Sequence, residues 1–293
     1  MVRTRPAVLS GTWYPSDPAE LAAQIDGFLA AAEPAQHPAG RPLIALVPHA
    51  GYMYSGPTAG RLYGLLGDWA PRRVFVLAPN HRVALHRVAL SSAGAFATPL
   101  GAVAVDLAAT ARLTEHSLFS IDDQAHAQEH AVEIQLPLLQ RTWPADLPQI
   151  VPLLVPHLDG TAGREVARAL AAEMQPDDLL LVSTDFTHYG AAFGYVPFGQ
   201  DIPDSLEKLD AGAILKVLAG DAEGLRQYGR ETGITMCGLQ AAAVALDCGL
   251  PEGYEGALLH YSRSGDRDND YAQSVSYAAV LLCSGPNPNQ EAL

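Results

Sequence analysis

The sequence has 293 residues, of which 48% are hydrophobic, so it can form one large α/β domain or two smaller ones around a sizeable core. Its formal net charge of −14, with only 18 Lys and Arg residues and no basic run, argues against a nucleic-acid partner. Its 3 widely spaced cysteines exclude a disulfide framework, and the lack of a signal peptide or bilayer-spanning run predicts a cytoplasmic protein without a membrane partner.

The first segment, residues 7–16, is irregular and carries Trp13 and Tyr14. Their aromatic rings either fill a gap between loops or reach back to cover another part of the molecule. Asp17 and Glu20 then stand at the N-cap and N3 positions of a helix. We expect this helix to end before the Pro- and Gly-rich break at 34–42.

Two apolar runs are followed by the same short motif. Residues 43–47 form a run typical of a strand buried on both faces, and Pro48 ends it directly before His49. Residues 74–78 form a second such strand, which ends at Pro79-Asn80-His81. After the first strand, Gly51 and Gly56 predict a turn, and a helix is expected over 58–66.

The remaining elements complete an α/β pattern. We expect strands at 88–91, 102–105, 150–155, 179–183, 258–262 and 275–283, and helices at 106–115, 161–174, 204–218, 222–228 and 239–246. The strand at 150–155 contains Pro152, which predicts an edge position or a bulge. No linker divides the chain, so we predict one α/β domain over 1–283 and a polar, disordered tail over 284–293.

Three strand ends therefore deliver a histidine to one edge of the sheet: His49, His81 and, after the strand at 179–183, His188. Ligands bind at that edge in open α/β sheets. His49 and His81 with one anionic residue would form a facial metal triad of the non-haem iron type. The residues alone leave Asp185, Glu133 and Cys237 open as the anion, with His188 as acid or base.

Two further features bear on this site. Cys237 precedes the Ala-rich helix at 239–246, where a helix amino terminus favours the thiolate. His130 and Glu133 are spaced to share one helical face, where they form either a functional pair or a local ion pair in a solvated turn.

The loop at 189–202 is expected to form a wall or lid over the site. The acidic run at 264–270 is an exposed turn, because it lacks the glycine and glutamate of a calcium loop.

Several of these segments resemble the Memo family, which belongs to the AmmeMemoRadiSam system. The matching motifs are Gly11-Thr12-Trp13-Tyr14-Pro15, Pro48-His49-Ala50-Gly51-Tyr52 with Tyr54-Ser55-Gly56, Pro79-Asn80-His81, Glu129-His130 to Pro137, Ser183-Thr184-Asp185-Phe186-Thr187-His188-Tyr189, Met236-Cys237-Gly238 and Ser264-Gly265-Asp266. The resemblance implies a single α/β domain with a mixed, largely buried central sheet flanked by helices, similar to class III extradiol dioxygenases.

The same resemblance implies roles for individual residues. His49, His81 and Cys237 would bind the metal, with Asp185 and His188 beside them as catalytic residues. Substrate contacts are assigned to His130, Glu133, Tyr54 and Trp13. The dioxygenases use a glutamate where this chain has Cys237, and a thiolate is a softer ligand. The resemblance implies iron(II) first, and the thiolate favours copper or zinc as well, so we expect iron(II), with copper possible and zinc less favoured.

Two functions follow as expectations. The first is a metal-dependent, dioxygenase-like oxidoreductase acting on a small aromatic or peptide-borne substrate. Bacterial and archaeal members of the family often accompany a radical-SAM protein and an AMMECR1-type protein, which implies such partners here. The alternative is a peptide- or phosphopeptide-binding module with a structural or vestigial metal site, because animal relatives are described as binding phosphotyrosine peptides.

Overall fold

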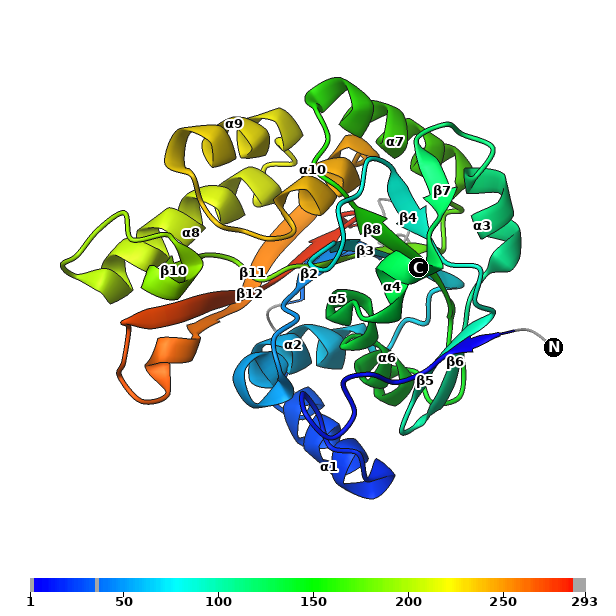
Figure 1. Cartoon of the computed structure of the whole chain (residues 1–293), viewed down its shortest axis with the longest axis horizontal. Helices are drawn as coiled ribbons and strands as arrows, with labels where there is room; N and C mark the ends of the chain where they lie inside the picture. The colour runs from blue at the N-terminus through cyan, green and yellow to red at the C-terminus, as the bar shows by residue number, and fades with distance from the viewer. Residues whose placement is uncertain (1–2, 35–36, 287–293) are drawn as a thin grey trace.

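The computed structural model describes residues 3–34 and 37–286, and its centre is a large mixed sheet (Figure 1). The strands follow the order β10-β12-β2-β9-β3-β8-β4-β7, and β11 also pairs with β12. Their bounds are β2 Pro42–Val47, β3 Arg73–Pro79, β4 Val88–Leu90, β7 Phe119–Ile121, β8 Gln149–Val155, β9 Leu179–Ser183, β10 His188–Gly190, β11 Glu255–Arg263 and β12 Gln273–Cys283.

The centre of this sheet is parallel and its flanks are antiparallel. Strands β2, β9, β3 and β8 run in one direction, with Val47 opposite Ser183 and Leu77 opposite Val182. Strand β12 is antiparallel to β2, and β4 is antiparallel to β8. The core strands β3 and β9 are buried along their whole length, as continuous apolar runs predict. The predicted mixed and largely buried sheet is therefore confirmed.

Helices cover both faces of the sheet and create two hydrophobic cores (Figure 1). One face carries α1 (Pro18–Leu29), α2 (Tyr52–Leu66), α5 (His130–Glu133) and α6 (Leu136–Thr142), and the other carries α3 (Leu107–Leu113), α7 (Gly160–Glu173), α8 (Ile202–Leu218), α9 (Ala222–Thr232) and α10 (Leu239–Asp247). Helix α4 (Asp123–Ala127) lies against β4, and short 3-10 helices span Ala191–Phe193 and Ser264–Asp266.

A small second sheet lies beside the main one. It contains β1 (Thr4–Arg5), β5 (Ala95–Thr98) and β6 (Gly101–Ala104) in the order β1-β5-β6. The pairing of β1 with β5 joins the amino-terminal arm to the middle of the chain. This non-local contact brings residues 5–14 toward α5, where they contribute to the surroundings of the site.

Helix α2 begins earlier than the sequence predicts. It starts at Tyr52, although Pro57 lies inside it and removes one backbone donor. The carbonyl of Met53, which residue 57 of an ordinary helix would satisfy, accepts a hydrogen bond from Arg267 instead. As a result, His49 lies in the tight turn between β2 and α2.

The position predicted for the strand with Pro152 is also wrong in part. Strand β8 lies inside the sheet, between β3 and β4. However, β4 pairs only with Leu153 and Leu154, so Pro152 has a strand neighbour on the β3 side alone. The proline therefore occupies a position that is locally an edge, although the strand is central.

The carboxyl-terminal end of the described chain stays close to the sheet. The backbone N–H of Ser284 donates to the carbonyl of Arg41 at 2.9 Å. Residues 287–293, to which most of the predicted tail belongs, lie outside the described residues. Within the described ranges, none of the helices combines the length and hydropathy that crossing a bilayer requires.

Candidate metal centre

The carboxyl ends of β2, β9 and β3 are neighbours and carry the site. His49 follows β2, Asp185 follows β9, and His81 follows β3. The parallel pairing brings these positions to one edge, as the repeated strand-proline-histidine motif predicts. His130, the first residue of α5, joins them from the adjoining helix.

Three imidazoles form a compact group at this edge. One ring nitrogen from each of His49, His81 and His130 lies within 4.8 Å of the others, so the group could hold a metal ion. The ring centroids are 5.3 Å apart for His49 and His81, and 4.4 Å apart for His81 and His130. His49 and His130 are buried, whereas His81 faces the outside.

Hydrogen bonds fix the tautomer of His49. The hydroxyl of Ser183 donates its single proton to the carbonyl of Ala131 at 2.6 Å and accepts from Gln135 at 2.8 Å. It must therefore accept from Nδ1–H of His49, 3.1 Å away. Burial, and then the neighbouring His81, lowers the pKa of His49. The ring is neutral, and the Nε2 lone pair, which faces the sulfur of Cys237, could bind a metal.

Glu129 holds His81 in an equivalent way. Its carboxylate accepts from the backbone N–H of His81 at 2.7 Å and from Nδ1–H at 3.0 Å. It also accepts from the N–H groups of His130 and Ala131, as the N-cap of α5. Burial acts to raise the pKa of Glu129, but these bonds and the histidines hold it below its usual range. Carboxylate-histidine pairs of this kind support metal sites.

His130 has a different environment. Its Nδ1 is 3.1 Å from a carboxylate oxygen of Glu129, but the angle is not that of a hydrogen bond, so this buried nitrogen has no hydrogen-bond partner. Burial, and then His49, lowers the pKa of His130. Trp13 covers it, with ring centroids 4.6 Å apart. The arm thus reaches back over the site rather than filling a gap between loops.

Cys237 adjoins the histidines on one side. Its sulfur is 3.2 Å from Nε2 of His49 and accepts from the backbone N–H of Asp185 at 3.3 Å. Among the described residues, it does not belong to the set whose ligand atoms all lie within 4.8 Å. Gly238 allows this position, because a Cβ there would lie 2.4 Å from Thr184.

The expected stabilisation of the Cys237 thiolate does not occur in the protein alone. Burial, and then the nearby Asp185, raises the pKa of the Cys237 thiol. Burial also raises the pKa of Asp185, whose carboxylate accepts from the backbone N–H of His49 at 2.7 Å. The effect of the helix terminus is therefore outweighed, and a bound cation would be needed to favour both anions.

His188 is positioned by the backbone. Its Nδ1 is 3.0 Å from the carbonyls of both Phe186 and Thr235, which can only accept. Nδ1 therefore carries the proton and Nε2 a lone pair. Two backbone carbonyls, rather than the carboxylate of Asp185, therefore set this tautomer. The loop after β10 contributes Phe193, whose ring centroid is 5.3 Å from that of His188.

Glu133 does not pair with His130 as its spacing allowed. Its carboxylate forms an ion pair with Arg5 and accepts from the hydroxyl of Tyr14 at 2.6 Å. The backbone N–H groups of Val8 and Leu9 donate to it as well. With the side chain buried and both oxygens occupied, Glu133 fixes the arm and has no oxygen free for a substrate.

Tyr54 lies at a cavity whose lining includes none of the three grouped histidines. It is 44% exposed, and with Phe193 and Tyr277 it lines a cavity of about 420 Å³. Arg267 lies over the Tyr54 ring at 5.2 Å. This aromatic wall is accessible to a ligand, so the predicted substrate contact of Tyr54 stays a prediction.

Three residues of the site were not predicted from the sequence: Glu129, Ser183 and Gln135. Glu129 is adjacent to His130 and precedes a short helix, but glutamate is not a usual N-cap. Gln135 also donates to the carbonyl of Pro48 at 3.0 Å. Its polar side chain in an otherwise apolar stretch was the available signal, since buried polar groups need partners.

The fold and this edge define an α/β protein with a histidine group at the carboxyl ends of parallel strands. The family described as Memo-like protein matches residues 5–281. A MEMO1 family protein of Methanopyrus kandleri is 34% identical over 294 residues, covering 96% of this chain and 99% of that protein. Protein MEMO1 of Xenopus laevis is 32% identical over 290 residues, covering 95% and 97%. The chain belongs to the Memo family.

A solved structure supports the fold independently. An uncharacterized protein from Escherichia coli K12 matches with a TM-score of 0.53 at 16% identity, covering 83% of this chain and 100% of that one. At this identity the similarity concerns the fold alone. The predicted family and fold class are both confirmed, whereas metal identity and chemistry require separate support.

Proposed function

We propose that this protein is a metal-dependent oxidoreductase that uses iron(II), or alternatively copper, on a small aromatic or peptide-borne substrate. The observation that carries the proposal is the group of His49, His81 and His130, with one nitrogen of each within 4.8 Å of the others. Neutral imidazoles are the form that binds metals, and the Nδ1 atoms of His49 and His81 face Ser183 and Glu129, which leaves Nε2 as the nitrogen that could bind the ion.

The donor set fits a redox-active transition metal. Imidazole nitrogens suit iron, copper and zinc, while the thiol of Cys237 adds a soft donor beside His49. The Nδ1 of His130 is buried without a hydrogen-bond partner, which a ligand or ion would supply. When bound, such a metal would supply a Lewis acid and a redox centre for a reaction with dioxygen.

The other residues would prepare the substrate. The Nε2 lone pair of His188 could accept a proton from an aromatic hydroxyl, because Nδ1–H is already committed to backbone carbonyls. Asp185 is buried beside Cys237 and His49, where it could balance positive charge. Trp13 covers His130 and restricts the access of water.

Metal analysis of protein purified without oxygen tests this proposal. We expect iron or copper near one equivalent, and oxygen uptake when catechol or 3,4-dihydroxybenzoate is added. Zinc alone, or a redox metal without oxygen uptake on any aromatic or peptide substrate tried, would contradict the proposed chemistry. The same assay can include candidate radical-SAM and AMMECR1-type partner proteins, which we propose as partners from family membership.

Variants separate two possible ligand sets. The family resemblance implies His49, His81 and Cys237, whereas the geometry groups His49, His81 and His130. Cobalt(II) bound by a thiolate shows a sulfur-to-metal absorption band, which Cys237→Ser would abolish if Cys237 is a ligand. If Cys237 is not a ligand, the Ser variant keeps its cobalt affinity and His130→Gln loses it.

The peptide-binding alternative has one observation in its favour. Tyr54 and Phe193 are exposed aromatic residues at the cavity of about 420 Å³, close to His188 through Phe193. Exposed aromatic residues are typical of recognition surfaces. Binding of a tyrosine peptide and its phosphorylated form to metal-free protein, lost in Tyr54→Ala, would favour this function.

A further inference from the structure

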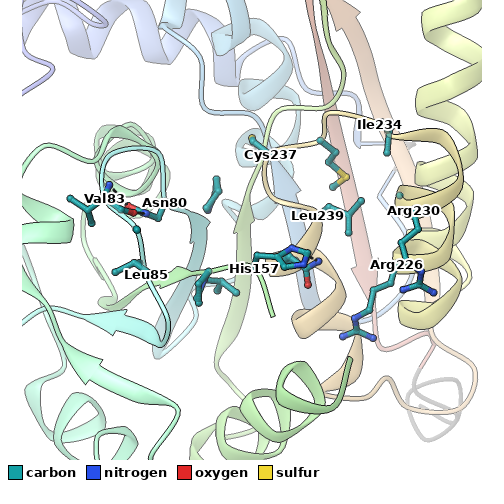
Figure 2. Close-up of a pocket in the computed structure, with 16 residues that line it drawn as sticks. Asn80, Val83, Leu85, His157, Arg226, Arg230, Ile234, Cys237 and Leu239 are labelled. Carbon is teal, nitrogen blue, oxygen red and sulfur yellow. Dashed lines mark hydrogen bonds between the residues drawn. The ribbon is translucent and has the colours of Figure 1, made fainter. Parts of the chain in front are cut away.

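A cavity of about 470 Å³ adjoins the metal centre on the side of Cys237 (Figure 2). Asn80, Val83 and Leu85 lie on one side of it in Figure 2, and Arg226, Arg230 and Ile234 lie on the other. Asn80 precedes His81 in the chain, and the sulfur of Cys237 is 3.2 Å from His49. A molecule in this cavity would therefore lie next to the histidine group.

The charge of the cavity lining is opposite to that of the protein. The chain has a formal net charge of −14. The residues that line the cavity include Arg226, Arg230 and His157, but no Asp or Glu. His157 lies in the loop that follows β8. A positive cavity in an acidic protein favours a negatively charged ligand.

Arg226 has donors to spare at the cavity wall. The residue is 4% exposed, and one terminal nitrogen, Nη2, forms an ion pair with Asp247. Its Nη1 is 3.7 Å from Glu223, too far for a hydrogen bond, and both Nη1 and Nε have no hydrogen-bond partner. Buried guanidinium groups normally use most of their five N–H donors. An anionic group in the cavity would compensate this charge.

The rest of the cavity lining is uncharged and mostly apolar. Val83, Leu85, Ile234 and Met236 provide the apolar part, and the side-chain oxygen of Gln240 is buried without a partner. Small-molecule sites usually have an apolar lining with a few polar groups that fix orientation. An aromatic or short aliphatic body would match the apolar walls.

We propose that this cavity binds the carboxylate or phosphate of a small anionic substrate, with Arg226 and Arg230 holding the anion and the substrate body extending toward Cys237. This substrate class rests on the proposed oxidoreductase function, because it assumes that the metal centre is where the ligand reacts. The anion site itself can be tested without the metal.

Binding of three matched probes to the full-length, metal-free protein tests the cavity. The probes are benzoate, phenyl phosphate and neutral benzamide, and the measurement is isothermal titration calorimetry. We expect one or both anions to bind and benzamide to bind at least tenfold more weakly. Comparing benzoate with phenyl phosphate shows which anion is preferred. If all three bind equally, or none binds, the proposal is wrong.

Two arginines provide a matched pair of variants. Arg230 lines the cavity and pairs with Glu223 at 3.1 Å, with an exposed side chain that should tolerate substitution. Arg164 lies on α7, contacts the same Glu223 at 3.8 Å and does not line the cavity. We expect Arg230→Gln to weaken anion binding by about 5–30-fold and Arg164→Gln by less than about twofold. Equal losses would indicate a general charge effect and overturn the proposal.

Arg226 is tested without leaving a buried ion unpaired. The double variant Arg226→Gln with Asp247→Asn removes both charges and keeps hydrogen-bonding groups. It should bind benzoate or phenyl phosphate at least tenfold more weakly, with an unfolding temperature close to that of Arg230→Gln. Unchanged affinity in this variant and in Arg230→Gln would exclude the site. If the anions bind but protein purified without oxygen contains no redox metal, only the proposed oxidoreductase function is contradicted.

Discussion

Two glutamates at opposite ends of α5 are used in different ways. Glu129 precedes the helix and Glu133 is its last residue, and both side chains are buried. Glu133 is neutralised by Arg5 and anchors the arm. The carboxylate of Glu129 has only histidine and backbone partners, and Lys and Arg side chains do not pair with it in the part of the chain that is described.

The difference shows how one short helix contributes both to the stability of the fold and to the candidate metal centre. A carboxylate matched by an arginine stabilises the fold, and its charge is already compensated. The charge of Glu129 is shared with His81, and through that ring it can strengthen a bond to a metal. The same residue type therefore acts structurally at one end of α5 and on the site at the other.

The largest expected effect is a loss of stability when the buried pair of Glu133 and Arg5 is broken. Replacing Glu133 with Gln leaves Arg5, which is 5% exposed, as a buried cation without its anion. We expect a loss of about 3–5 kcal/mol in the free energy of unfolding, measured by urea denaturation of the metal-free protein. Metal affinity of the folded fraction should be nearly unchanged.

Asp26→Asn is the control for this change. It removes the ion pair with Arg141, in which both side chains are substantially exposed. Exposed pairs contribute about 0–1 kcal/mol, so this variant should unfold close to the parent. If Glu133→Gln were no less stable than Asp26→Asn, the buried pair would not hold the arm.

The next effect concerns His126, which lies on α4 and whose backbone carbonyl accepts a hydrogen bond from Arg5. Burial lowers the pKa of His126 from 6.5 to about 4, and its Nε2–H donates to the carbonyl of Ala89. The unfolded chain binds a proton below pH 6.5 that the folded protein accepts only near pH 4. Stability should therefore fall as the pH drops through this window, by about 3 kcal/mol from this group.

Urea denaturation from pH 7.5 to pH 4 measures this dependence. Because other buried histidines also titrate, the informative quantity is the difference between the parent and His126→Gln, which can still donate to Ala89. The variant should lose less stability over the window. Identical pH profiles would mean that His126 is protonated as easily in the folded protein as in the unfolded chain.

Glu129→Gln should affect the site more than the fold. The amide keeps an acceptor for Nδ1–H of His81 but removes the charge. We expect metal affinity to fall by about 10–100-fold, measured by competition with a chelator. Asp159→Asn is the control, because Asp159 caps α7 with the same kind of hydrogen bonds and has no histidine partner. Equal metal affinity in all three proteins would assign Glu129 a structural role only.

Most of the fold could be predicted because its strands are strongly patterned. Continuous apolar runs predict buried parallel strands, and β2, β3 and β9 formed where expected. Short elements such as α5, with four residues, have no usable period. The early start of α2 depends on Arg267, which is distant in sequence and satisfies the carbonyl that Pro57 cannot. Such non-local compensation is not visible in a local pattern.

The part of the site that lies directly after the strands could be predicted from the sequence. His49 and His81 were found because parallel strands bring their carboxyl ends together. His130 was placed near the site but not in the metal group, because the orientation of α5 depends on the arm and Arg5. The raised pKa of Cys237 depends first on burial, and burial is a property of the whole fold.

The smallest expected effect comes from removing a single hydrogen bond, the one from Tyr14 to Glu133. The hydroxyl of Tyr14 donates to Glu133 at 2.6 Å, and burial, followed by that carboxylate, raises the pKa of Tyr14, so it remains a phenol. Tyr14→Phe removes this donor while Arg5 and two backbone N–H groups still serve the carboxylate. We therefore expect the free energy of unfolding to fall by about 1.5 kcal/mol, at the low end for a hydrogen bond to a charged group, measured by urea denaturation.

The metal affinity of Tyr14→Phe should stay within about twofold of the parent, because the lost hydrogen bond stabilises the arm and not the histidines. A tenfold loss of metal affinity in Tyr14→Phe, with little change in stability, would show that the two ends of α5 are coupled and that Glu133 also supports the site.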